Sequence, residues 1–540
     1  MESVCNFCRT ILSVLVSICA ILILVVMPFY FQEGYTHIGT DKSYFFRTGI
    51  VRMAKLLLPV LAVWLACTLT KSLIYKTHHR EKSTLQSWAA DMRKYLVPTD
   101  IFCLLYAIAV IVSYFCSDYR QTALWGTRGW FMGMFPQLAL VALYLLVSRF
   151  QLLEKWLLCL CLPVSAATFV LGCLNRFDIW PLPMPNSGLP AYISTIGNIN
   201  WYCGYIVAVF FLGVGLLWLD KGTNLSTALL SAYVLTGFAA LITNGSDSGL
   251  FALAVVLLTL FVLSAGDENA LRIRRFWLIV LLLAGACFLI MGLRFLFPGR
   301  INYTTWLGDL LTYSPFPALL LIAAALGLYL SKARDRHPSV TTYFVRAMRI
   351  AAKILCVAVP AGLLAFALMI LINTTHPGSL GALSDKSIFT FNKQWGSYRG
   401  ATWSIGLRCF AEQDPLHKLV GVGSDCMADF LYTDASPALL ETVRDAFKER
   451  RLTNAHCELL TLLVNVGLWG ALAFAGILFS ILKRFLGARE HNAYAAACGL
   501  CVLAYIANNL WSFQQSMSVA TIFAVMGLGE RCLRRERDSK

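Results

Sequence analysis

A histidine at the junction of a polar and an apolar segment is the first residue that could do chemistry. The stretch 451–475 reads RLTNAHCELLTLLVNVGLWGALAFA, and His456 lies where its polar part ends. Thr453 or Asn454 is predicted to cap the next helix, which would place His456 in the first helical turn. The helix dipole there favours a bound anion and a neutral imidazole, so His456 is predicted to act as a base. The alternative is an interfacial histidine that binds lipid headgroups or a neighbouring loop.

Arginines are the candidates for holding an anion. Arg399 and Arg408 lie on different faces of one amphipathic piece, and a guanidinium can bind diphosphate oxygens through two parallel hydrogen bonds. Either residue could instead form a surface ion pair with Glu412 or Asp414. Arg294, near the end of an apolar run, either faces a cavity or extends to the membrane surface.

Two short segments supply smaller polar side chains. In GNINWYCGY, Asn198 and Asn200 could bind sugar hydroxyls. The aromatic pair that follows them, Trp201 and Tyr202, could stack on a sugar ring or anchor the membrane interface. In NGSDSG, Asp247 either caps the following helix or binds a sugar hydroxyl or an arginine.

Apolar runs must position these residues. Of the 540 residues 58% are hydrophobic and 14% are charged, whereas a soluble protein carries about a quarter charged residues. About 14 runs approach the roughly 20 residues that cross a bilayer. The sequence therefore predicts an all-α polytopic transmembrane bundle, with the first run retained as a helix rather than removed as a signal peptide.

Basic residues predict how the bundle lies in the membrane. They concentrate in alternate connections, at 71–94, 272–275, 332–349 and 531–540. By the positive-inside rule these connections and both termini face the cytoplasm. The net charge of +16 follows from this topology, and no nucleic-acid partner is expected because the basic residues are dispersed.

One connection, 373–455, is much longer than the others and is predicted to face outward. Its pieces GATWSIGLRCFAEQ and SPALLETVRDAFKERR have helical periodicity, and DPLHKLVGVGSD between them is rich in turn residues. A connection of this length is predicted to be a functional cap. Cys409 and Cys426 both lie in it and could pair.

Motifs for cofactors are missing from the sequence. It contains no phosphate-binding loop, no dinucleotide-binding fingerprint and no two C-x-x-C motifs at the spacing of a zinc site. Most of the 18 cysteines lie inside apolar runs, where thiols act as small hydrophobic groups. No metal or other cofactor is therefore expected, and a reaction outside the membrane would need a donor that is already activated.

Taken in order, the motifs resemble the O-antigen ligase and O-antigen polymerase superfamily of bacterial membrane glycosyltransferases. The resemblance covers about residues 195–480, with a looser echo in SDYRQTALWGTRGWFMG at 117–133. It is carried by GNINWYCGY, by RGATW as an R-x-x-x-W piece, by DPLHKLVGVG, and by HCELLTLLVNVGLWG, in which a histidine opens a helix reading L-x-x-x-x-G-x-x-G. None of these motifs is specific alone, and the resemblance rests on their order.

The resemblance implies that the roughly 14 apolar runs form a GT-C-like bundle, over which the helical extracytoplasmic loop 373–455 lies. It divides the chain into N-terminal helices (1–194), the ligase-like region (195–480) and C-terminal helices with a basic tail (481–540). The donor would be an undecaprenyl-diphosphate-linked oligosaccharide at the outer face of the bacterial cytoplasmic (inner) membrane. Arg399 would hold the diphosphate and His456 would assist glycan transfer, with a flippase and a chain-length regulator as possible partners.

One departure from the family pattern affects the expected activity. Where the family has S-R-G, this chain has Ser246-Asp247-Ser248, so an arginine is replaced by a carboxylate. Arg294, Arg128 or Arg120 could supply the missing guanidinium. The departure favours a polymerase or a divergent relative over a strict ligase.

A multi-helix polysaccharide flippase or other transporter is the alternative function. Transporters commonly place charged residues at mid-membrane and have balanced halves. This sequence instead has few charges inside its apolar runs and a single outsized outer connection. These features favour the glycosyltransferase.

Overall fold

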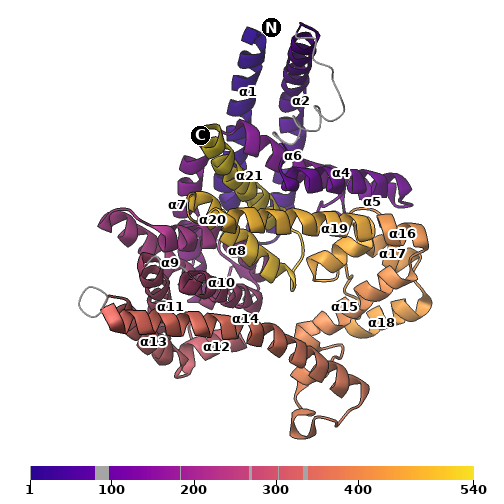
Figure 1. Cartoon of the computed structure of the whole chain (residues 1–540). Coiled ribbons are helices and arrows are strands. Elements are labelled where there is room, and N and C mark those ends of the chain that lie inside the picture. Colours follow the sequence, from indigo (N-terminus) through magenta and orange to yellow (C-terminus); the bar gives the residue numbers. More distant parts are fainter. Residues whose placement is uncertain are drawn as a thin grey trace.

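The computed structural model describes residues 2–78, 96–182, 184–185, 187–266, 270–301, 303–332 and 338–539, and it is almost entirely helical (Figure 1). Within these ranges a single β-ladder occurs, which is antiparallel and joins β1 (Tyr192–Ile193) to β2 (Gly197–Asn198). Parts of the basic connections that predict the orientation, at 79–95, 333–337 and 540, lie outside the described residues.

The predicted apolar runs all form helices. These are α1 (Glu2–Ile21), α2 (Ile38–His78), α4 (Pro98–Cys116), α6 (Met134–Phe150), α7 (Glu154–Arg176), α8 (Ile199–Leu219), α9 (Asn224–Thr243), α10 (Asp247–Gly266), α11 (Ala270–Leu296), α13 (Phe316–Lys332), α14 (Pro338–Thr375), α19 (Glu458–Gly487), α20 (Ala493–Asn509) and α21 (Ser516–Ser539).

Length and composition make this a multi-pass membrane protein. Within the described ranges, eleven helices are long and apolar enough to cross a membrane. The number is twelve if α12 (Trp306–Tyr313) and α13, which meet at 63°, form one span, while α6 and α20 are shorter apolar helices. The all-α polytopic class is confirmed, whereas the count of fourteen spans and the GT-C likeness stay predictions.

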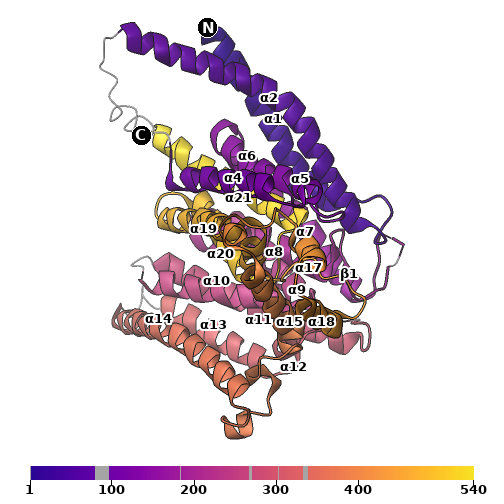
Figure 2. The same cartoon turned by 90° about the vertical axis from the view of Figure 1, so that its right-hand side faces the viewer.

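Burial separates central from peripheral helices. In the most apolar windows of α8 and α21, 94% of the residues are buried, whereas 0% of the α14 window is buried. α14 lies along the edge of the molecule in both views, with α8 near the middle (Figures 1 and 2). Apolar side chains on α14, including Val357 and Leu364, are exposed and are therefore suited to contact lipid.

Residues 376–457, called the cap below, form a helical unit at one end of the bundle (Figure 1). Both pieces predicted to be helical are helical. The cap contains η4 (Gly381–Leu383), η5 (Ser387–Phe389), α15 (Trp395–Glu412), α16 (Pro415–Val420), α17 (Met427–Thr433) and α18 (Pro437–Phe447).

Most residues of a second, small hydrophobic core belong to the cap, including Ile405, Leu431 and Leu439, and Ala123 and Val464 join it from outside the cap. Cys409 and Cys426 belong to this core as buried free thiols, so they do not form the disulfide considered from the sequence.

The turn-rich stretch DPLHKLVGVGSD is helical in its first half, contrary to the prediction of a turn. The Asp414 carboxylate accepts hydrogen bonds from the backbone N–H groups of Leu416 and His417, and Pro415 occupies the start of α16. A capping aspartate followed by proline is a strong helix start. The turn begins only at Gly421, whose φ is 79°.

A break in α19 attaches the cap to the bundle. Gly467 inside α19 has a φ of 67°, and a side chain there would collide with the backbone of Leu419. At the break, two carbonyl groups of α19 accept hydrogen bonds from the backbone of the cap. Val422 N–H donates to Val464 O (3.2 Å), and Gly423 N–H donates to Asn465 O (2.9 Å). A glycine at this position lets two backbones meet without a steric penalty.

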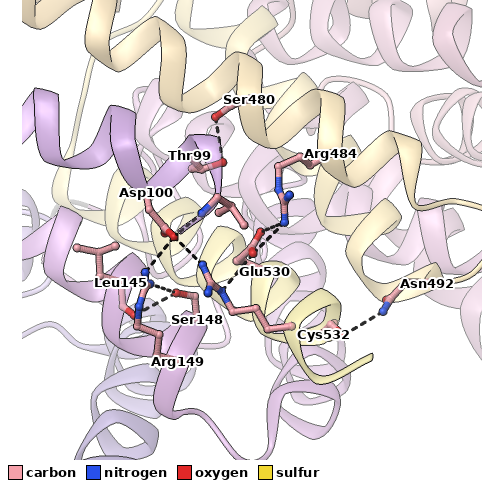
Figure 3. A network of polar contacts seen from close by, with 12 residues as sticks. Thr99, Asp100, Leu145, Ser148, Arg149, Ser480, Arg484, Asn492, Glu530 and Cys532 are labelled. Carbon is pink, nitrogen blue, oxygen red and sulfur yellow. Dashed lines mark hydrogen bonds and ion pairs between the residues drawn. The ribbon is translucent and has the colours of Figure 1, made fainter. Parts of the chain in front are cut away.

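A buried ionic network joins α4, α6, α19 and α21 at the ends of α19 and α21 that lie away from the cap (Figure 3). Asp100 of α4 lies 3.0 Å from Arg149 of α6 and 2.7 Å from Arg534 of α21. Glu530 of α21 lies 3.2 Å from Arg534 and 3.0 Å from Arg484 of α19. Both carboxylates have fully buried side chains.

We expect Asp100→Ala to lower the stability of the bundle. It would leave the guanidiniums of Arg149 and Arg534 without their shared carboxylate, and breaking a buried ion pair costs about 3–5 kcal/mol. The measurement is the thermal denaturation midpoint of the detergent-purified protein. The control is Asp445→Ala, which removes an exposed ion pair with Lys393 and should leave the midpoint unchanged. Equal midpoints for both variants would contradict the structural role of the network.

Candidate functional site

His456 lies just before α19 instead of in its first turn. The helix begins at Glu458 with Cys457 as its N-cap, and His456 has a left-handed φ of 49°. The Asn454 side chain accepts a hydrogen bond from the backbone N–H of His456 (3.0 Å), so it closes a turn. The prediction that Thr453 or Asn454 caps this helix is therefore wrong, because an asparagine can bond the N–H two residues ahead in a turn as well as in a helix cap.

The imidazole of His456 is half-buried and neutral at pH 7. Its ring meets the ring of Phe513 edge to face, with centroids 5.1 Å apart. Burial, together with the positive charge of Arg399, lowers the pKa of His456 to about 4. The neutral state expected from the sequence thus arises from desolvation and a nearby cation instead of a helix dipole.

Arg399 is a half-buried cation held by carbonyl groups. It follows a left-handed turn formed by residues 396–398, and its Nη1 and Nη2 atoms donate to Ser397 O (3.2 Å) and Trp511 O (3.1 Å). Its Nε is buried and has no hydrogen-bond partner. In the described part of the chain, no carboxylate forms an ion pair with Arg399. Buried charges are normally paired, so this guanidinium is suited to bind an anionic ligand.

Residues 508–516 (NNLWSFQQS), called the 508–516 turn below, cover the end of α20, the connection and the start of α21. This turn connects Arg399 to His456. Trp511, whose carbonyl binds Arg399, stacks on Trp403 with ring centroids 5.1 Å apart. Phe513 contacts His456 and, on its other side, Trp130 (5.2 Å). The sequence analysis missed this turn, although four amides beside two aromatic residues between two apolar runs were a signal for it.

Glu458 is a second residue that the sequence analysis missed. It is 3% exposed, and its carboxylate accepts hydrogen bonds from the Tyr505 hydroxyl (2.6 Å) and the Asn509 amide (2.9 Å). No lysine, arginine or histidine among the described residues forms an ion pair with it. An unpaired acidic side chain at the start of an apolar helix, two residues after His456, is a recognisable sign of a functional position.

The two short polar motifs, GNINWYCGY and NGSDSG, meet beside the 508–516 turn. The Ser246 hydroxyl donates to the Asn200 side-chain oxygen (3.0 Å) and lies 3.0 Å from the Ser248 hydroxyl. Ser248 in turn contacts the Cys203 thiol (3.5 Å), which donates to Asn508 (3.4 Å). A chain of polar groups therefore runs from Asn200 to the 508–516 turn.

The remaining residues of these motifs have structural contacts. Asn198 caps α8 by accepting a hydrogen bond from the Asn200 N–H (2.9 Å). Asp247 is the exposed first residue of α10, and Phe251, one turn later, meets Trp511 edge to face (6.1 Å). Both motifs thus lie near the turn that binds Arg399.

The aromatic residues of GNINWYCGY pack inside the protein. The hydroxyl of the buried Tyr202 donates to Thr168 O (3.0 Å). Trp201 meets Trp130 edge to face (5.7 Å) and fills the space above Gly39, where a side chain would collide with it. The full burial of Tyr202 leaves it neither an interfacial anchor nor a sugar-stacking platform, whereas either role for the half-buried Trp201 stays a prediction.

Arg408 and Arg294 are engaged by other elements. Arg408 donates to Thr442 on α18 (3.1 Å) and lies 3.8 Å from Glu412, which is the surface ion pair considered as the alternative. Arg294 pairs with Asp309 (2.9 Å) and lies over the ring of Tyr313 (4.1 Å).

Arg120 and Arg128 were the other candidates for the guanidinium that Asp247 replaces. Arg120 donates to Phe115 O (3.1 Å), and Arg128 is exposed. The structure therefore brings His456 and Arg399 into contact with one turn and links Asn200 to it through a chain of polar groups. Asp247 is exposed nearby, and Arg408 and Arg294 are held in separate local pairs.

Comparison with models of protein families and with curated proteins gave no match. The resemblance to the O-antigen ligase and polymerase superfamily therefore stays a prediction from the ordered motifs.

We expect His456 to titrate with a midpoint near pH 4, well below the ordinary value of about 6.5. The neutral variant Arg399→Gln should raise this midpoint, because the neighbouring cation would be gone. Histidine-selective NMR in detergent would follow the ring signals, with His456→Gln identifying the resonance. His417 is an internal control: burial lowers its pKa, but its hydrogen bonds to Asp414 and to Cys116 O, together with nearby carboxylate charges, raise the pKa overall. A His456 midpoint near 6.5 would show that the ring is hydrated.

Proposed function

We propose that this chain is a membrane glycosyltransferase that polymerises or ligates undecaprenyl-diphosphate-linked glycan. The observation that carries the proposal is the Arg399 guanidinium, which has no carboxylate partner within the described ranges and lies close enough to His456 to lower its pKa. A diphosphate supplies the charge and the oxygen pairs that such a guanidinium binds. The apolar helices supply the environment for a lipid-linked donor.

His456 acts as the base of this reaction. The acceptor hydroxyl oxygen bonds to the anomeric carbon of the donor, and the bond from that carbon to the diphosphate breaks with its electron pair on the phosphate. The acceptor proton passes to the imidazole. A diphosphate bound to Arg399 offsets the positive charge that lowers the pKa of His456, so the ring becomes a stronger base when the donor is present.

The basic connections predict which side of the membrane each part of the chain occupies. With both termini in the cytoplasm, the cap and the 508–516 turn lie at the outer face of the bacterial inner membrane. Lipid-linked glycans for O-antigen, capsule or wall polysaccharide would meet His456 there. Because Asp247 stands where the family pattern has an arginine, the proposal favours polymerisation over ligation.

We expect His456→Ala and Arg399→Ala to abolish long-chain surface glycan while leaving expression and membrane insertion intact. The first removes the base, and the second removes the cation that binds the diphosphate. Gel analysis of glycan length in the producing cell measures the effect. Arg408→Ala is the matched control, because its guanidinium contacts Thr442 and Glu412 on the cap surface, and it should keep wild-type lengths. Wild-type lengths in the first two variants would refute the mechanism.

A reconstituted reaction separates the possible activities. Purified protein is incubated in vesicles with fluorescent undecaprenyl-diphosphate oligosaccharide and no other acceptor. We expect a ladder of longer products, as a polymerase would give. Transfer only after a separate acceptor is added would identify a ligase. Movement of the donor across the vesicle membrane without any new glycosidic bond would instead identify a transporter and reject the enzyme.

A further inference from the structure

A small polar cavity lies next to His456. Its volume is about 30 Å³. Two of its lining residues also touch His456, because Asn454 accepts the His456 N–H and the Phe513 ring lies against the imidazole. Other lining residues are Glu458, Gln514, Ser424 and Asp425. The cavity is therefore positioned to hold part of a molecule that reacts at His456.

Ser424 has a buried hydroxyl that the protein leaves without a partner. The residue is 2% exposed, it lines the cavity, and its Oγ has no hydrogen-bond partner within the described ranges. Leaving a buried polar atom unpaired costs about 1–3 kcal/mol. Such a group is expected to hydrogen-bond either water or a polar group of a ligand.

Two carboxyl groups line the same cavity. The donors to Glu458 within the described ranges are neutral, and they include Tyr505, Asn509 and Gln514. The Asp425 carboxyl accepts hydrogen bonds from the backbone N–H groups of Thr127 (2.7 Å) and Met132 (3.3 Å), and burial raises the pKa of Asp425 to about 7. Carboxyl, amide and hydroxyl groups together accept from and donate to a hydroxyl group.

The size of the cavity limits what can enter it. A water molecule needs about 10–15 Å³ of such space, so about two water-sized groups fit. A hydroxymethyl group, with one carbon and one oxygen, has this size, whereas a whole sugar ring does not fit. A ring could remain outside, next to the aromatic side chains of Trp130 and Phe513, which also line the cavity.

We propose that this cavity is a subsite for the primary hydroxyl group of a hexose, bound by Glu458, Gln514 and Ser424. The inference rests on the proposed function, because it assigns the substrate of that site to sugars with a free hydroxymethyl group. It adds a requirement that His456 and Arg399 do not impose. A 6-deoxy sugar in the same position would leave the cavity polar groups unpaired, and sites of this kind discriminate strongly against the missing hydroxyl.

Binding is tested without any transfer reaction. Detergent-purified full-length protein is titrated with methyl glucoside, methyl galactoside and methyl mannoside, and with the 6-deoxy counterpart of each. Tryptophan fluorescence and the thermal midpoint report binding. We expect at least one hexoside to bind in the millimolar range and its 6-deoxy counterpart to bind at least tenfold more weakly.

Variants at Ser424 test the cavity itself. Ser424→Ala removes an oxygen with no partner in the protein, so it should leave the thermal midpoint unchanged and weaken the hexoside about tenfold. Ser424→Val, which also fills the space, should abolish the preference for the hydroxymethyl sugar. The control is Ser404→Ala on α15, whose hydroxyl donates to Gly400 O (2.7 Å) away from the cavity, and it should bind the hexoside like the wild type.

The outcomes separate this inference from the proposed function. Equal affinities for hexosides and 6-deoxy hexosides, no binding at all, or wild-type binding by Ser424→Ala would each overturn the subsite and leave a cavity that holds water only. Failure of the wild-type protein to form any glycosidic bond, with selective hexoside binding retained, would reject the glycosyltransferase and keep the sugar subsite.

Discussion

The break in α19 at Gly467 is the constraint on which the arrangement of the site depends. A continuous helix would satisfy its own carbonyl groups, whereas the break offers Val464 O and Asn465 O to the backbone of the cap. Backbone bonds of this kind are insensitive to side-chain changes and fix two segments at a set distance. The cap carries both Arg399 and His456, so the anchoring bonds help to place both residues against the 508–516 turn of the bundle.

Buried charged groups have different partners at the two ends of the bundle. In the network of Figure 3, each buried carboxylate has two guanidinium partners, and these ion pairs hold the helices together. Near the cap, Arg399 and Glu458 are both withdrawn from solvent, and in this part of the described structure neither is neutralised by an ion pair. Uncompensated groups of this sort reduce stability, and proteins retain them where a ligand completes the set.

Local pattern predicted the helices but not the composition of the site. Apolar runs of membrane length and the amphipathic pieces of the cap are properties of neighbouring residues, so they could be read directly. The role of Asn454 could not be predicted, because its side chain can accept a hydrogen bond in a turn as well as in a helix cap. Trp511 and Phe513 join Arg399 to His456 only after helices that are distant in the sequence have packed together. The spacing of residues along the chain therefore could not predict that contact.

The position of α21 has a consequence for biosynthesis. This helix follows all the other described helices in the sequence, yet it is among the most deeply enclosed of them. α6 and α8 both pack against it, so the seam that these earlier helices form with α21 stays unfilled until residues 516–539 are inserted. A nascent chain stalled before residue 516 would expose that seam to quality-control proteases and chaperones of the membrane.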